Sequence, residues 1–452
     1  MNGIYRIDDT ICAPATSSGG AISIVRVSGP DCFRAVDKVV CMRRGDAAGA
    51  AGFSLHFGVV EGLDEVLVSI FRAPHSYTGE DMAEISCHAS PYVVAELVRR
   101  LCEAGCRPAE AGEFTRRAFT AGKLDLSQAE AVADLIAADS MAAHKLAFSQ
   151  LRGAYSHKLR QLRGQLTELA ALLELELDFS EEDLEFANRD KLADLSADAL
   201  AECRRLSDSF RLGNAFKKGV PVAIVGAVNS GKSTLLNALL GEERAIVSDV
   251  PGTTRDTVEE LLSINGVSYR LIDTAGIRET QESVERMGIE RSFDKLDGAS
   301  VVVIMLDGTA PQAEWEEIER AVGPRIGPEA RVIRARNKTD LLDSPSPLPG
   351  VLDISALTGA GMDALKNAIS ADDAERLKES DGALVSNVRH CKALENAASC
   401  LERFSDGLSK GLGTELLAED LREALSELGE IFGEVTHFEI TDVIFKRFCI
   451  GK

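Results

Sequence analysis

The stretch Gly226-Ala227-Val228-Asn229-Ser230-Gly231-Lys232-Ser233 has the spacing G-x-x-x-x-G-K-S. It follows an apolar run from Val220 to Val225 and precedes a helical apolar pattern that begins at Thr234. A strand, a glycine loop and a helix in this order form a phosphate-binding loop, because backbone N–H groups and the positive helix end face an anion. Lys232 can reach the β- and γ-phosphates, and the Ser233 hydroxyl suits Mg²⁺. The stretch predicts a nucleotide site.

Four further motifs follow in order and indicate which nucleotide binds. Gly252-Thr253-Thr254-Arg255-Asp256 offers Thr254 as a second hydroxyl for Mg²⁺, and Asp273-Thr274-Ala275-Gly276 ends an apolar segment. In Asn337-Lys338-Thr339-Asp340, which matches N-K-x-D, the carboxylate of Asp340 can accept hydrogen bonds from guanine N1 and N2. Ser355-Ala356-Leu357 resembles the loop that lies behind a guanine ring. This order favours GTP over ATP.

Composition restricts the compartment and the partners. The chain has 452 residues, enough for two to four domains, and its net charge of -22 opposes general adhesion to nucleic acid or anionic membranes. A nucleic-acid substrate would therefore need a local basic patch or a basic partner. The ten cysteines form no C-x-x-C pair, and no second pair answers Cys102 and Cys106. With no N-terminal signal and no membrane-spanning apolar run, we expect a cytoplasmic protein.

The apolar periodicity changes twice along the chain. Residues 1–120 alternate like strands before a helical pattern from Pro91 to Leu101, which predicts a small α+β domain. Helical spacing dominates residues 121–213, through Leu151, Leu159, Leu162, Leu166, Leu169 and Leu173. It returns in 377–452, where the first run is expected to start at Leu384 and Val388 and the second includes Leu417 to Phe432. We therefore predict a nucleotide domain, 214–376, inserted into a helical one.

Within 214–376, two apolar runs, Val301 to Leu306 and Val332 to Ala335, are typical of core strands in a mostly parallel sheet. Asn265-Gly266 lies between two strand-like segments and predicts a hairpin turn.

Over essentially its whole length the chain resembles the MnmE (TrmE) family of tRNA-modification GTPases. The resemblance rests on six segments: Ile24 to Gly29 (IVRVSG), Ser76 to Asp81 (SYTGED), Gly112 to Phe119 (GEFTRRAF), Lys123 to Glu130 (KLDLSQAE), the GTTRD motif, and Phe448 to Lys452 (FCIGK).

The resemblance implies a multidomain α/β protein with an N-terminal α+β folate-binding domain that dimerises, an α-helical domain, and an inserted Ras-like P-loop G domain. It implies a homodimer that joins the FAD-dependent MnmG (GidA) in a heterotetramer or larger complex. It implies no association with a membrane. Such complexes add aminomethyl or carboxymethylaminomethyl groups at carbon 5 of the wobble uridine, position 34, of tRNA. The one-carbon unit comes from 5-formyl- or 5,10-methylene-tetrahydrofolate.

The resemblance also implies residue roles. Arg26, Glu84, Lys123 and Lys452 match folate contacts. Two segments near them depart from the family pattern: Ser17 to Ile22 has fewer glycines, and His88-Ala89-Ser90 replaces His-Gly-Gly. If either lost glycine held a positive φ, the folate pocket would change shape.

For hydrolysis, the position after DTAG is Ile277, where Ras-type proteins carry a glutamine that orients water. The resemblance implies that Glu285 orients water instead. It also implies that K⁺, bound by Asn229, Ser248, Thr253 and the Val250 carbonyl when two G domains meet, replaces an arginine finger. The predicted GTP site, which includes the Mg²⁺ ligands Ser233 and Thr254, comprises Asn229, Ser230, Gly231, Lys232, Ser233, Thr234, Ser248, Asp249, Val250, Pro251, Gly252, Thr253, Thr254, Asp273, Thr274, Ala275, Gly276, Asn337, Lys338, Asp340, Ser355, Ala356 and Leu357.

Two alternatives remain open at this point. Cys449 is either a catalytic or redox thiolate or a small residue that packs beside Phe445 and Phe448. The whole chain could instead be a ribosome-assembly GTPase of the Era or Der type, which shares the G motifs. An Era-like chain should end in a basic RNA-binding module and a Der-like chain carries two G domains, whereas this chain ends in acidic helices and has one.

Overall fold

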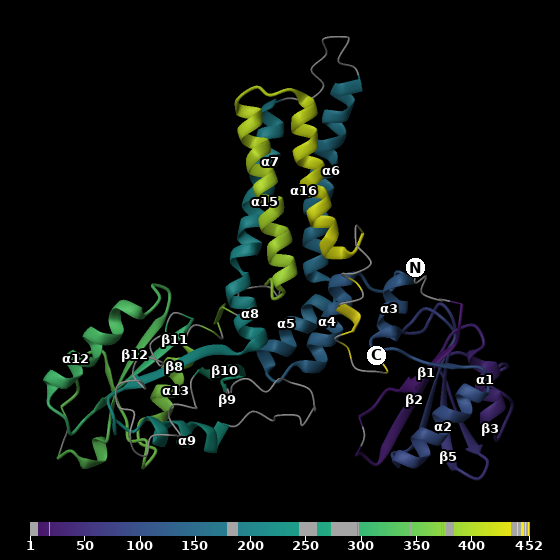
Figure 1. Ribbon diagram of the computed structural model, residues 1–452, viewed down its shortest axis with the longest axis horizontal. Coiled ribbons are helices and arrows are strands. Elements are labelled where there is room, and N and C mark those ends of the chain that lie inside the picture. Colours follow the sequence, from purple (N-terminus) through teal and green to yellow (C-terminus); the bar gives the residue numbers. More distant parts are fainter. Residues whose placement is uncertain are drawn as a thin grey trace. The chain divides into compact units, whose positions relative to one another are not determined.

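The computed structural model describes residues 8–17, 19–178, 189–243, 260–272, 296, 298–343, 346–371, 373, 375–376, 384–434, 441, 444–446, 448 and 451. The chain divides into two compact units (Figure 1). Unit 1 contains residues 1–133 together with 429–452, and unit 2 contains residues 134–428. None of the helices in the described part is long and apolar enough to cross a membrane.

Unit 1 is built on one seven-stranded sheet. The strand order is β3 (Cys41–Met42), β4 (Ser54–Val60), β5 (Asp64–Phe71), β6 (Met82–His88), β2 (Ile22–Ser28), β1 (Ile11–Pro14) and β7 (Arg107–Pro108). Neighbouring strands are antiparallel except β1 and β7. Helices α1 (Cys32–Val39) and α2 (Pro91–Glu103) share one apolar cluster with the sheet. The predicted α+β domain is confirmed, although β4 and α1 were not predicted.

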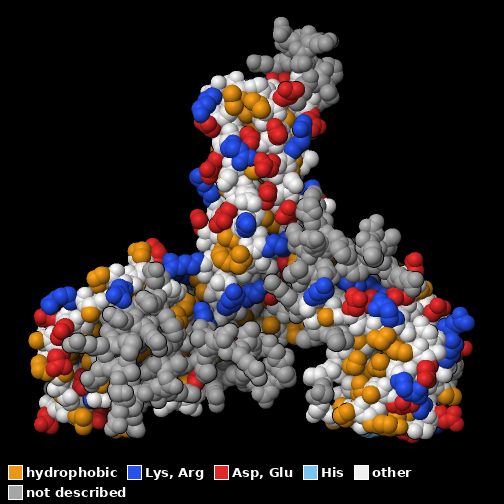
Figure 2. Space-filling view, viewed as in Figure 1, with side chains coloured by type: hydrophobic (Ala, Val, Ile, Leu, Met, Phe, Trp, Pro, Cys, Tyr) orange, Lys and Arg blue, Asp and Glu red, His pale blue; other side chains and the backbone are white. Residues whose placement is uncertain are grey.

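The other face of this sheet leaves apolar side chains exposed. Along β4 and β5, alternate residues such as Val60, Val66 and Val68 are buried. The residues between them face the opposite side, because strand side chains alternate. These and one preceding residue form what we call the apolar stripe: Phe53, Leu55, Phe57, Val59 and Leu67, each 39% to 74% exposed. Figure 2 shows hydrophobic side chains gathered on unit 1.

A buried ion-pair network joins two of the quoted motifs in unit 1. Arg117, on α3 (Glu113–Thr120), is 4% exposed and donates to Glu80 at 3.1 Å, Asp9 at 2.6 Å and Glu113 at 3.2 Å. Burial raises the pKa of the Glu113 carboxyl, but hydrogen bonds from Arg107 and the Glu110 N–H outweigh it, and the pKa lies below its usual 4.5. The network holds GEFTRRAF against SYTGED.

Unit 2 contains a helical bundle of α6 (Ala154–Asp178), α7 (Arg189–Asp208), α15 (Val388–Ser409) and α16 (Thr414–Phe432). The predicted leucines of α6 from Leu159 to Leu173 are buried, which confirms the helical periodicity. Arg403 on α15 pairs with Asp420 on α16 at 2.9 Å, and Arg422 on α16 pairs with Glu174 on α6 at 3.2 Å.

The predicted start of the helix α15 is wrong. Leu384 lies in a segment without helical structure, 384–387, and Val388 is 59% exposed. The Asn387 side chain caps the helix by accepting a hydrogen bond from the Arg389 N–H at 2.9 Å, so the helix cannot begin earlier. Leu384 instead packs in the G-domain cluster with Phe216.

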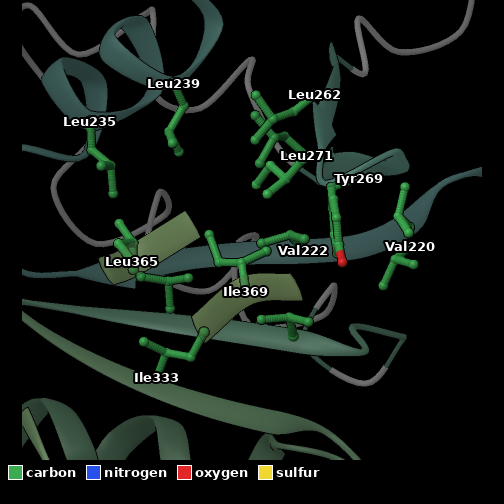
Figure 3. Close-up of a cluster of buried hydrophobic side chains, with 14 of the residues drawn as sticks. Val220, Val222, Leu235, Leu239, Leu262, Tyr269, Leu271, Ile333, Leu365 and Ile369 are labelled. Carbon is green, nitrogen blue, oxygen red and sulfur yellow. The ribbon is translucent and has the colours of Figure 1, made fainter. Parts of the chain in front are cut away.

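The inserted domain is a six-stranded sheet with the order β13 (Val351–Asp353), β12 (Arg331–Asn337), β11 (Val301–Asp307), β8 (Val220–Gly226), β10 (Val267–Ile272) and β9 (Glu260–Ile264). All pairs are parallel except β9 with β10, as predicted. Helices α9 (Lys232–Glu243) and α13 (Met362–Ser370) share one apolar cluster with the sheet (Figure 3). Helix α12 (Gln312–Val322) contributes to a second cluster.

The β9–β10 hairpin is anchored to the helical part of unit 2. Asn265 and Gly266 both have positive φ, 51° and 79°, which confirms the predicted turn. The Ala142 N–H of α5 (Met141–Leu151) donates to the Gly266 carbonyl at 3.0 Å. Ser268 donates to Asp139 at 3.1 Å. The positive φ of Gly266 favours glycine there, and a Cβ would lie 2.4 Å from Met141 Cε, the flexible end of that side chain, which would have to move.

We expect Arg117→Ala to weaken unit 1 by about 3 kcal/mol near neutral pH, because it leaves buried carboxylates short of a partner. Burial raises the pKa of Asp9, but hydrogen bonds from Arg107 and Arg117 bring it below its usual 3.8 in the folded state, so the Arg117 contribution is complete above about pH 3.8 and disappears as pH falls through the folded pKa. The difference between Arg117→Ala and wild type should therefore shrink in acid. Hydrogen exchange of β2 and β6 amides in the full chain measures it.

The matched control is Arg99→Ala, an arginine 53% exposed and paired with Glu96 on the same helix, which should weaken unit 1 far less than Arg117→Ala because water screens an exposed pair. Equal losses for the two variants, or a difference that does not change with pH, would contradict the assignment.

Candidate functional site

The phosphate loop connects β8 to α9 as the sequence predicts. Asn229 and Gly231 have positive φ of 62° and 95°, which turns successive N–H groups inward. Asparagine tolerates this conformation better than most residues with a side chain. A Cβ on Gly231 would lie 2.2 Å from Asn337 Nδ2, and one on Gly226 would lie 2.5 Å from the Met305 carbonyl. Both glycines are required because the backbone approaches other atoms closely.

Lys232 folds over this loop. Its Nζ donates to the carbonyl oxygens of Gly226 at 2.9 Å and Ala227 at 2.6 Å. Burial lowers the pKa of Lys232, because a buried ammonium loses hydration. A negative phosphate beside it would restore the favoured charged state. The loop, its glycine conformations and this lysine therefore fit a nucleotide phosphate.

Asn337, at the end of β12, connects three loops. Its Nδ2 donates to the Ser230 carbonyl at 2.9 Å, and its Oδ1 accepts from the Ala356 N–H at 2.9 Å. Its side chain is buried, so each of these hydrogen bonds is protected from water. The N-K-x-D motif is thus joined both to the phosphate loop and to Ser355-Ala356-Leu357, which brings the predicted phosphate and base residues together.

The side chains for the base lie beside this connection. Ser355 Oγ donates to Asp340 Oδ1 at 2.6 Å, which orients the carboxylate, and Leu357 is 79% exposed. Lys338 has a positive φ of 64°, and its Nζ donates to Asp307 Oδ2 at 2.7 Å. Burial raises the pKa of Asp307, but hydrogen bonds from Lys338 and Thr309 bring it below its usual range. Lys338 therefore faces a carboxylate that stays charged.

The structure also brings together a second group of predicted residues, in unit 1. Arg26 on β2 and Glu84 on β6 are register partners, and Arg26 Nε and Nη2 donate to Glu84 Oε1 at 3.0 and 2.8 Å. The Arg26 guanidinium carbon lies 5.3 Å from the centre of the Tyr77 ring and 5.4 Å from that of Phe114. Charged donors and acceptors between aromatic rings suit a flat, polar heterocycle such as a pterin.

The segment that carries FCIGK reaches the same pair. Arg26 Nη1 donates to the Gly451 carbonyl at 3.1 Å, and Gly451 is held against β1, where a Cβ would lie 2.0 Å from the Pro14 carbonyl. Lys123 Nζ donates to the Pro74 carbonyl at 2.7 Å. The second departure from the family pattern does not strain the backbone, because Ser90 has a φ of −69° and Ala89 is not among the residues with positive φ. The first includes Ser18, which lies outside the described residues.

Several predicted residues lie outside the described part of the chain, and they share loops of the G domain or the C-terminal segment. They are Ser248, Asp249, Val250, Pro251, Gly252, Thr253, Thr254, Asp273, Thr274, Ala275, Gly276, Ile277, Glu285, Cys449 and Lys452. Their predicted roles remain predictions. Within the described residues, no group of three or more His, Cys, Asp or Glu side chains could hold a metal ion.

Sequence reasoning did not assign three residues that the structure places in these groups. Asp307 directly follows the apolar core strand β11, and the carboxyl ends of parallel strands are where ligand groups gather, so this signal was available. Tyr77 and Phe114 occur within SYTGED and GEFTRRAF but were given no role. Their place beside Arg26 depends on strand pairing and could not be read from spacing.

Comparison with known proteins supports the resemblance to MnmE (TrmE) proteins over nearly the whole chain. The MnmE helical domain family matches residues 126–449, and the family of the GTP-binding protein TrmE N-terminus matches residues 10–123. The tRNA modification GTPase MnmE of Bacteroides thetaiotaomicron is 45% identical over 464 residues, covering 98% of this chain and 99% of that protein. The same-named protein of Christiangramia forsetii is 46% identical over 477 residues, covering 99% and 100%.

Among solved structures, the G domain of FeoB from Methanococcus jannaschii aligns with 34% of this chain and 98% of its own, at 27% identity and a TM-score of 0.25. The family matches and the full-length relatives carry the assignment. They decide against the Era- or Der-type alternative, because both the N-terminal and the helical parts match. The chain belongs to the MnmE family of tRNA modification GTPases.

Proposed function

We propose that this protein is the GTP-hydrolysing subunit of a complex that modifies carbon 5 of the wobble uridine in tRNA. The observation that carries the proposal is the Asn337 side chain, which joins the phosphate loop to the base-reading loop at 2.9 Å on both sides. A guanine nucleotide requires this arrangement, because the residues that contact its phosphates and those that contact its base must be held at a fixed distance from each other. Membership in the MnmE family supplies the tRNA context.

Each part of the site has a defined task toward GTP. Backbone N–H groups of the phosphate loop and Lys232 hold the β- and γ-phosphates, and Ser233 with Thr254 holds Mg²⁺. Asp340, oriented by Ser355, accepts from guanine N1 and N2 and thereby selects guanine over adenine. Leu357 is exposed enough to cover the ring.

Hydrolysis needs charge stabilisation that the described residues do not provide in full. A bound K⁺ would supply positive charge beside the phosphates, held by Asn229, Ser248, Val250 and Thr253. Asn229 lies in the phosphate loop with a left-handed backbone conformation, and this position beside the phosphates supports a role as a K⁺ ligand. Glu285 positions the attacking water, since Ile277 cannot accept a hydrogen bond from it.

The Arg26 group in unit 1 is proposed to hold a tetrahydrofolate. The bound folate supplies the one-carbon unit that is transferred to uridine. Arg26 and Glu84 face its polar groups, while Lys123 and Lys452 neutralise its glutamyl carboxylates. The contact between Arg26 and Gly451 supports a place for Lys452 at this site, and Cys449 is carried by the same segment.

The proposed assembly is a homodimer that binds an FAD-dependent partner of the MnmG type in the cytoplasm. The apolar stripe of unit 1 supports dimerisation, because five large apolar side chains gathered on one sheet face are costly to leave in water. G domains from the two copies would then meet to complete the K⁺ site.

The function predicts a specific change in tRNA. Cells lacking this protein should lose the aminomethyl and carboxymethylaminomethyl groups at uridine 34, as measured by nucleoside mass spectrometry. Asn337→Ala should fail to restore them, because two buried groups lose their partners and GTP affinity falls about 10- to 100-fold. The control Asn367→Ala, at an exposed position on α13, should restore them. Unchanged nucleosides in the deletion, without a redundant enzyme, would reject the proposal.

The hydrolysis mechanism predicts a dependence on K⁺ rather than Na⁺, whose smaller radius fits poorly. Asn229→Gly keeps the left-handed backbone but removes the side chain, and it should abolish the K⁺ response. Glu285→Ala should bind GTP normally but turn over roughly 100-fold more slowly. GTP turnover and affinity in matched K⁺ and Na⁺ buffers measure both effects. Equal turnover in the two salts with an unaffected Glu285→Ala would defeat the mechanism.

The folate assignment predicts binding to the full-length protein. Calorimetry should detect 5-formyl-tetrahydrofolate, and Arg26→Gln or Glu84→Gln should weaken it about 10-fold or more, because a charge-assisted contact is lost. Arg34→Gln, an arginine 73% exposed on α1, should have no effect. If the wild-type protein binds no folate, or if all three variants bind it equally, Arg26 and Glu84 are not the site.

A further inference from the structure

An acid-free stretch interrupts this acidic chain. Residues 140–167 contain no Asp or Glu, although 72 acidic residues among 452 would place about four in a stretch of 28. The same stretch carries two histidines and five Lys or Arg residues: Lys145, Arg152, Lys158, Arg160 and Arg163. A second acid-free stretch, 209–241, contains helix α8 (Phe210–Lys218). Local positive charge is what an otherwise acidic protein needs in order to contact a polyanion.

The first of these stretches places an aromatic and guanidinium ladder on the outer face of α5. This helix buries Ala142, Leu146 and Gln150. On its exposed face, His144, Phe148 and Arg152 follow at four-residue intervals. The His144 and Phe148 rings are stacked, with centroids 5.8 Å apart and planes 13° apart. The Arg152 guanidinium carbon lies 4.6 Å from the Phe148 ring centre.

Helix stabilisation alone does not account for this ladder. Side chains four residues apart on a helix do contact one another and add a few tenths of a kcal/mol. That gain needs no aromatic ring on a solvent-facing position, yet Phe148 is 39% exposed. The two ends of the ladder, the His144 ring and the Arg152 guanidinium, are exposed. Exposed flat groups of this kind are what unpaired nucleic-acid bases stack on, because every base has a π face.

Helix α8 extends the basic surface beside the ladder. It packs against α5, and its Arg211 and Lys218 are exposed, seven residues apart on the face opposite Phe216. Lys218 lines a cavity of about 110 Å³ together with the buried residues Ala143 and Ala147, so it lies beside the buried face of α5. Lys217 is paired with Asp134 at 2.7 Å. Figure 2 shows Lys and Arg side chains over the region where Figure 1 labels α5 and α8.

We propose that α5 and α8 form an RNA-binding surface, on which unpaired bases stack on the His144–Phe148–Arg152 ladder while Arg211 and Lys218 contact phosphates. This inference rests on the proposed function, and it identifies where the tRNA substrate lies on this chain. A single-stranded loop fits better than a duplex, because duplex bases are stacked on each other and cannot reach a protein ring. The same helix α5 anchors the β9–β10 hairpin, so bound RNA would contact an element that also touches the G domain.

The test is binding of an unmodified tRNA transcript, with uridine at position 34, to the full-length protein by fluorescence anisotropy at several salt concentrations. Phe148→Ala should weaken binding about 10-fold, because it removes the ring that aligns the His144 ring and the Arg152 guanidinium, whereas Phe148→Tyr should retain binding. Arg211→Glu with Lys218→Glu should weaken binding further and reduce the slope of log affinity against log salt by about 2. K⁺-dependent GTP turnover should remain unchanged in all of them, which shows that they fold.

The matched control is Arg320→Glu, an exposed arginine on α12 at a distance in sequence from both stretches, and it should bind tRNA as the wild type does. If the wild type binds tRNA and every variant binds equally well, this surface is wrong and the proposed function stands. If the wild type binds no tRNA, the proposed surface is wrong, and the nucleoside analysis of cells lacking the protein decides the proposed function separately. A variant that keeps tRNA affinity but loses the FAD-dependent partner would show a protein interface instead, and that outcome also overturns the proposal.

Discussion

The carboxamide of Asn337 is the interaction on which the G domain depends. It donates to the phosphate loop and accepts from the loop of Ser355 to Leu357, and it is buried between them. An amide suits this position because one planar group provides a donor and an acceptor at a fixed separation. Gly231 must lack a Cβ so that the amide can approach, which explains the second glycine of the motif as a packing requirement in addition to a phosphate one.

A comparable constraint organises unit 1, where arginine side chains rather than an amide join distant segments. Arg26 spans two strands and the C-terminal segment, because its three donors reach Glu84 and the Gly451 carbonyl in different directions. Arginine alone has this rigid fork of donors. Nearby, Arg117 uses the same property to hold Asp9, Glu80 and Glu113 together. The two arginines keep sequence-distant motifs in contact at the candidate folate site.

Because the G domain is inserted into the helical domain, a structural change at the nucleotide site can reach the helical domain through the contacts between them. The chain enters through α8 and returns through 384–387, which pack on each other so closely that a Cβ on Gly213 would lie 2.2 Å from the Val385 carbonyl. The β9–β10 hairpin lies in sequence between the GTTRD and DTAG motifs, and its turn is bonded to α5. A change that displaces β10 would therefore strain a contact with the helical domain, because the Ala142 N–H donates to the Gly266 carbonyl and Ser268 donates to Asp139.

The features with local causes could be predicted from the amino-acid sequence. The phosphate loop, the Asn265-Gly266 turn and the buried leucines of α6 all follow from conformational preference or periodicity within a few residues. Contacts between distant groups became visible in the folded chain alone. Asp307 meets Lys338, Tyr77 and Phe114 lie around Arg26, and Leu384 packs in the G-domain core rather than in a helix. These depend on strand register and on the path of an inserted domain, which no short stretch encodes, because the partners are brought together by burial of apolar surface elsewhere.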